Sequence, residues 1–152
     1  MPAAGKTLLQ GLLLSALLTA AVFGRTLFFD FVNLDDNSNL KKNPAMHNLA
    51  LAWEKPYLDA YLPVTYTAWY ALYQIAGTTT RPSPGNLDSW TPIPELQPLP
   101  FHAANVFLHA VNGALLFAIL TTLLPSASRS LLATLAAVFV LHPLQTEAVA
   151  WV

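Results

Sequence analysis

Two adjacent carboxylates, Asp35 and Asp36, are the residues whose type and spacing could do chemistry. They stand in the segment 30–37, just past a long apolar run, in a chain that has only 8 acidic residues. Adjacent carboxylates repel each other unless a cation, a shared proton or a set of hydrogen-bond donors holds them. Such a pair can act as a general base or bind a divalent cation such as Mg²⁺ or Mn²⁺. The alternative is a solvated loop, because loops favour Asp and Asn.

The composition indicates that these residues belong to a membrane protein. Of the 152 residues, 55% are hydrophobic and 10% are charged, and the mean hydropathy is +0.47. A soluble domain carries about 25% charged residues. The net charge of −1 provides no electrostatic basis for binding nucleic acid. The lack of cysteine excludes disulfides and thiolate metal sites.

We therefore predict an all-α fold: a polytopic membrane protein fragment with about three transmembrane helices. The predicted spans are 7–24, 101–124 and 126–142, and the first two are long enough to cross a bilayer. The third run reaches Pro143, which either lies near the membrane surface or kinks a helix that continues. For the first run, the alternative is a cleaved leader of an exported protein.

The outer loop 25–100 also contains a predicted helix. Its segment 63–76 is rich in Trp and Tyr and is too short to span, so we expect a helix on the membrane surface that ends at Gly77. The Pro-, Ser- and Thr-rich segment 78–100 predicts an irregular loop.

Positive charge indicates the orientation. Lys6 flanks the first span, and Arg129 lies in the short turn between the second and third spans, so both are expected on the cytoplasmic side. The loop 25–100 then lies outside, and the end of the third span places His142 and Glu147 on the same face as the acidic pair. This arrangement predicts a site at the outer face of the membrane; the alternative is a ring of solvated helix ends.

Four polar residues recur along the second span at spacings of 3, 4 and 3 residues, namely His102, Asn105, His109 and Asn112. They fall on one helical stripe, and unpaired polar groups are costly in hydrocarbon. We expect the stripe to face protein or a wet cavity, with Asn and His joining helices by hydrogen bonds. His102, nearest the outer surface, is also a candidate for contacting substrate.

Ordered stretches along the chain resemble the N-terminal part of membrane glycosyltransferases of the C-type superfold. Within that superfold the chain is similar to the branch with transmembrane and tetratricopeptide repeats, which resembles protein O-mannosyltransferases. The stretches are 31–36 with Asn43-Pro44, then 61–65, 101–112 and 141–152.

The resemblance implies that Asp35 and Asp36 act as base or metal ligands and that His102, His142 and Glu147 contact substrate. It implies a polyprenyl-phosphate sugar as donor, a Ser or Thr hydroxyl or another polymer as acceptor, and partners in the remaining helices of a full-length protein. It also implies a multi-pass protein, of the inner membrane if bacterial, with the active face outside the cytoplasm.

Three departures from the family pattern affect this expectation. Leu62 stands where the family usually has Arg, and the Pro-rich stretch 80–100 resembles an insertion before the second span. The chain is also far shorter than such enzymes, so we expect an inactive fragment. The alternative is a non-catalytic membrane assembly or scaffold protein of the same fold.

Overall fold

The computed structural model describes residues 3–31, 36–76, 78–81 and 93–151, and the protein is mostly helical, as predicted. The chain forms two compact units. One comprises Met1–Phe29 with His102–Val152, and the other comprises Asp30–Phe101.

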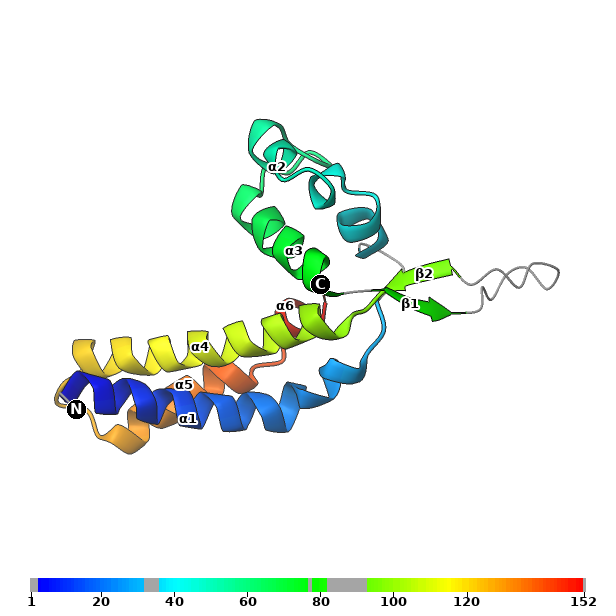
Figure 1. The fold of residues 1–152 in the computed structure, drawn as a ribbon. Coiled ribbons are helices and arrows are strands. Elements are labelled where there is room, and N and C mark those ends of the chain that lie inside the picture. Colours follow the sequence, from blue (N-terminus) through cyan, green and yellow to red (C-terminus); the bar gives the residue numbers. More distant parts are fainter. Residues whose placement is uncertain (1–2, 32–35, 77, 82–92, 152) are drawn as a thin grey trace. The chain divides into compact units, whose positions relative to one another are not determined.

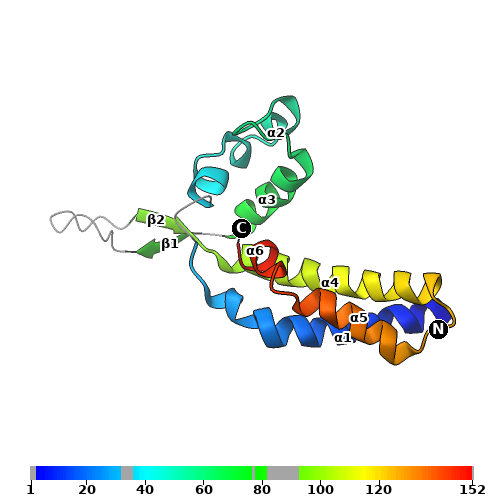
Figure 2. The ribbon, with the colours of Figure 1, turned by 180° about the vertical axis from the view of Figure 1, so that it is seen from behind.

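The first unit is a helical bundle. Helix α1 (Ala3–Phe23) continues as the 3₁₀ helix η1 (Gly24–Phe28) and lies beside α4 (Leu99–Leu123) and α5 (Arg129–Leu141), as Figures 1 and 2 show. A short helix, α6 (Gln145–Ala150), follows α5.

Local signals set the limits of α5. The Ser128 hydroxyl accepts a hydrogen bond from the Leu131 N–H at 3.3 Å and caps the start of the helix. At the other end, His142 takes up extended backbone angles (φ −64°, ψ 133°) because it precedes Pro143, which also has no N–H to donate. The helix therefore ends at Leu141, so the interpretation of Pro143 as a kink in one continuing helix is wrong.

The two ends that we expected on one side of the membrane meet in the bundle. The Arg129 Nη1 atom donates a hydrogen bond to the Gln10 Oε1 atom at 3.0 Å. Gln10 lies one turn past Lys6 on α1, so the start of α1 and the turn before α5 lie at one end of the bundle.

Small residues let the helices approach closely. Gly11, Ser15 and Thr19 recur every four residues on α1, and Ser15 and Thr19 are fully buried. A Cβ atom added at Gly113 of α4 would lie 2.6 Å from the Ser15 Oγ atom and 2.5 Å from a Val140 methyl group of α5. This is the small-xxx-small packing that membrane helices use.

Among the described residues, two helices are long and apolar enough to cross a membrane, Gly5–Phe28 and Leu99–Leu123. Their outer apolar side chains are uncovered: Leu17 is 69% exposed and Phe107 is 65% exposed. The third predicted span is not confirmed, because α5 has only 13 residues and reaches about 20 Å.

The second unit contains short helices around a small core. They are the π-helical turn η2 (Asn37–Lys41), the 3₁₀ turn η3 (Pro44–Met46), α2 (Ala50–Glu54) and α3 (Pro63–Ala76). Its buried residues include Leu40, Met46 and Tyr66. The bounds of α3 agree with the predicted helix 63–76, whereas the stop predicted at Gly77 lies outside the described residues.

A strand pair corrects the expectation of an all-α chain and, at residues 78–81 and 93–96, that of an irregular loop, whereas residues 82–92 lie outside the described residues. Strand β1 (Thr78–Arg81) pairs antiparallel with β2 (Ile93–Leu96), with Thr78 opposite Leu96 and Arg81 opposite Ile93. Backbone pairing needs no apolar alternation in the sequence, which is why the Thr- and Pro-rich composition did not reveal these strands.

Candidate functional site

Of the two acidic residues Asp35 and Asp36, the structure describes only Asp36. Asp35 lies outside the described residues, so its predicted roles as base and metal ligand are untested. Asp36 immediately precedes η2, and its side chain is 4% exposed. A solvated loop carboxylate would be open to water, so that interpretation is wrong for Asp36. Burying a carboxylate is costly unless other groups compensate for the lost water, which makes the position of Asp36 a specific feature of this unit.

His102 lies in the first turns of α4 and is 1% exposed. The substrate role predicted for it therefore requires a ligand that reaches a buried ring or a movement that uncovers it.

The other two predicted substrate residues lie on the surface. His142 follows α5, and its Nδ1 atom accepts a hydrogen bond from the Leu144 N–H at 3.2 Å. Glu147 lies in the first turn of α6. Both are exposed, and neither forms an ion pair with any residue that the structure describes. Their charged or polar ends are thus open to a ligand.

The described residues contain no group of three or more His, Asp or Glu side chains that could hold a metal ion. The predicted Mg²⁺ or Mn²⁺ site at Asp35 and Asp36 stays a prediction, because Asp35 is not among them.

The polar stripe of α4 joins helices at two of its positions. The His109 Nε2 atom lies 3.0 Å from the Val140 carbonyl oxygen of α5, and the Asn105 amide donates to the Trp151 carbonyl oxygen. Because a carbonyl only accepts, Nε2 of His109 carries a proton. The His109 ring also packs edge-on against Phe23, with ring centres 5.4 Å apart. The His109 contact matches the expectation of hydrogen bonds between helices, whereas the Asn105 contact reaches Trp151, which directly follows α6.

Asn112 departs from that expectation, because its side chain is exposed. At 100° per residue, position 112 lies about 80° around the helix from position 102, so the stripe rotates out of the packed face. Asn112 lies instead among exposed apolar residues, Leu108, Leu115 and Ile119.

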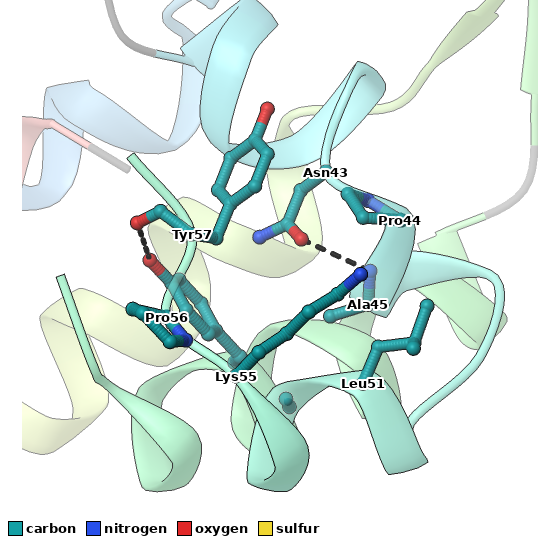
Figure 3. A pocket seen from close by; sticks show the side chains of 9 residues that line it. Asn43, Pro44, Ala45, Leu51, Lys55, Pro56 and Tyr57 are labelled. Carbon is teal, nitrogen blue, oxygen red and sulfur yellow. Dashed lines mark hydrogen bonds between the residues drawn. The ribbon is translucent and has the colours of Figure 1, made fainter. Parts of the chain in front are cut away.

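The second unit also contains a pocket that the sequence reasoning missed. A cavity of about 20 Å³ lies where η3, α2 and the start of α3 meet (Figure 3). It is lined by Asn43, Pro44, Ala45, Leu51, Ala52, Lys55, Pro56, Tyr57 and Tyr66. The one local signal was Asn43-Pro44, since Asn at the N-cap with Pro after it marks a helix start.

Hydrogen bonds hold the pocket wall. The Tyr57 hydroxyl donates a hydrogen bond at 2.9 Å to the carbonyl of Ser38, which stands two residues after Asp36. The Tyr66 hydroxyl donates to the Tyr57 carbonyl at 3.4 Å. Burial, with a smaller effect of nearby Tyr57, raises the pKa of Tyr66, so its phenol stays protonated as a donor. The pocket is thereby tied to the segment that follows the acidic pair.

No protein-family model, curated protein or solved structure matches the chain.

Proposed function

We propose that this chain is the N-terminal segment of an integral-membrane glycosyltransferase that moves a sugar from a polyprenyl-phosphate donor to a hydroxyl acceptor, such as a protein Ser or Thr. The observation that carries the proposal is the burial of Asp36 in a folded unit inserted between two long apolar helices. A loop that only joined two spans would have no reason to bury a carboxylate. The ordered family resemblance adds the reaction class.

In the proposed reaction, Asp36 or Asp35 takes the proton of the acceptor hydroxyl, and for the buried Asp36 this requires, as for His102, an acceptor that reaches it or a movement that uncovers it. The acceptor oxygen forms a bond to the anomeric carbon, while the bond to the donor phosphate breaks and the phosphate leaves with the electron pair. His142 and Glu147 are exposed side chains that could bind sugar hydroxyls. The remaining walls of the site would come from further helices of a full-length, multi-pass protein, with the active face outside the cytoplasm.

Replacing the buried carboxylate tests the proposal. In the full-length reading frame, Asp36→Asn is expected to lower sugar transfer from a polyprenyl-phosphate donor by about 10²–10⁴-fold, because a general base is lost. Radiolabelled sugar transfer in isolated membranes measures this effect. Asp59→Asn is the matched control: Asp59 is an exposed residue of the same unit whose φ of 60° Asn also adopts, so its transfer should not change.

Because Asp36 is buried, the amount of folded protein in the membrane must be measured by protease protection in the same samples. Normal transfer by a folded Asp36→Asn protein would remove Asp36 from the mechanism. Normal transfer by Asp35→Asn as well would favour the alternative, a non-catalytic assembly protein, which the lack of an arginine at Leu62 also favours.

The predicted topology can be tested separately, because a chain without cysteine allows clean single-cysteine labelling. A membrane-impermeant maleimide should label Lys42→Cys in intact cells and should label Ser126→Cys only after the membrane is opened. Both native residues are exposed, so access to the reagent depends on the membrane side. Labelling of both positions in intact cells would contradict the spanning arrangement, and the reverse pattern would contradict the orientation.

A further inference from the structure

The amide of Asn43 is a buried polar group of the second unit that the proposed reaction does not use. Its side chain is 1% exposed, and its Oδ1 atom accepts a hydrogen bond from the Ala45 N–H at 3.0 Å. A backbone N–H can only donate, so this bond fixes which end of the amide is oxygen and which is nitrogen. The Nδ2 atom is buried and has no hydrogen-bond partner among the residues that the structure describes.

A buried donor without an acceptor lowers stability by about 1–3 kcal/mol, so binding an acceptor at this atom would be favourable. Figure 3 shows Nδ2 of Asn43 pointing away from Ala45 toward the side of Tyr57, inside the ring of lining residues. The cavity of about 20 Å³ beside it has room for one water-sized atom such as an oxygen.

The rest of the lining favours an anionic oxygen over a neutral one. Lys55 extends across the pocket toward Asn43 and Ala45 (Figure 3), and it forms no ion pair with any described residue. Two of the nearby acceptors already bind donors, since Oδ1 of Asn43 accepts from the Ala45 N–H and the Tyr57 carbonyl accepts from the Tyr66 hydroxyl. The free polar groups are therefore an amide donor and an ammonium donor, and hydrogen bonds from an ammonium group to an anion are the stronger kind.

We propose that this pocket binds a phosphate group, with one phosphate oxygen in the cavity against Nδ2 of Asn43 and the others at the mouth against Lys55. Free phosphate and the headgroup of a phosphate-bearing lipid share this chemistry. The site belongs to the second unit alone, so the proposal holds whether or not the full-length protein transfers sugar.

The test follows the side-chain amide of Asn43 by ¹H–¹⁵N NMR in the full chain, held in a phosphate-free maltoside micelle at constant ionic strength. Titration with inorganic phosphate is expected to shift the Asn43 amide signals saturably. A second titration uses a short-chain phosphatidic acid, with phosphatidylcholine as the reference lipid, and shows whether the phosphate ligand is free or part of a lipid. If phosphatidic acid binds at least about tenfold tighter than inorganic phosphate, the ligand is a lipid headgroup.

Phosphate binding by two variants and one control, measured by calorimetry, tests the roles of Asn43 and Lys55. Asn43→Asp keeps the oxygen that caps Ala45 but removes both donors and adds negative charge, so phosphate binding should weaken by at least about tenfold. Lys55→Gln should weaken binding about fivefold. Lys42→Gln removes an exposed lysine next to Asn43 and should change binding by less than about twofold.

If Asn43→Asp fails to fold, Asn43→Ser preserves a capping oxygen and should show the same loss of binding. No saturable shift of the Asn43 amide with either phosphate source would overturn the proposal, and the cavity would then hold only water. Equal weakening by Lys42→Gln and Lys55→Gln would also overturn it, because the binding would then be general surface attraction.

Discussion

Gly113→Leu is expected to disrupt the packing of the three long bundle helices and to lower the free energy of unfolding by about 3 kcal/mol or more. The first atom of any side chain at this position would lie 2.5 Å from a Val140 methyl group and 3.0 Å from the Ser15 Cβ atom. Neither neighbour can move freely, because Val140 is 0% exposed and Ser15 is 1% exposed. The helices must therefore separate, and the seam between α1, α4 and α5 loses its contacts.

Titration of the micelle-bound chain with dodecyl sulfate, followed by circular dichroism, measures this loss. Gly24→Leu is the matched control, because a Cβ atom added at Gly24 meets nothing within 4 Å. Its effect should stay within about 0.5 kcal/mol. If the two variants unfolded alike, the close approach of α4 to Ser15 and Val140 would be contradicted.

His109→Phe is expected to lower the free energy of unfolding by about 1–2 kcal/mol while leaving the ring packing in place. In a continuing helix, the Leu144 N–H would satisfy the Val140 carbonyl, but here it donates to Nδ1 of His142. His109 supplies the replacement donor at 3.0 Å. A phenylalanine ring can keep the contacts with Phe23 and Phe139 but leaves this buried carbonyl without a donor.

The same unfolding titration applies, with Asn112→Leu as the control on the same helix. Asn112 is exposed, so its replacement should change stability by no more than about 0.5 kcal/mol. A larger loss at Asn112 than at His109 would mean that the whole polar stripe faces protein, as its spacing alone predicts. The comparison therefore separates the sequence pattern from the packing that the structure shows.

Features that depend on neighbouring residues in the chain could be predicted from the sequence. The apolar runs predicted α1 and α4, and the aromatic segment 63–76 predicted α3 with its bounds. Pro143 has a local effect on the helix because it has no N–H, but the sequence left open whether it ends or kinks the helix, and the structure shows that α5 ends at Leu141. In the candidate site, the sequence singled out Asp36, His142 and Glu147, but it did not show that the first is buried and the other two are exposed.

Features that bring together distant parts of the chain could not be predicted from the sequence. The strand pair β1–β2 depends on backbone pairing between two four-residue segments that are well separated in the sequence. The pocket brings Asn43, Lys55 and Tyr66 together from three elements, and only their spacing in three dimensions leaves the Asn43 amide without an acceptor. The amino-acid sequence alone does not indicate which buried donor will lack an acceptor in the folded protein.

The sequence by itself determined the helical character, the two long apolar helices and the place of the acidic pair in the loop between them, because hydrophobic runs and proline act on their own neighbourhood. The tertiary structure decided which polar residues are buried. A helix turns by 100° per residue, so His109 faces α5 while Asn112, three residues later on the same stripe, faces outward. It also decided the close seam of Gly113 with Ser15 and Val140, since contacts between residues on three different helices exist only once the helices are packed.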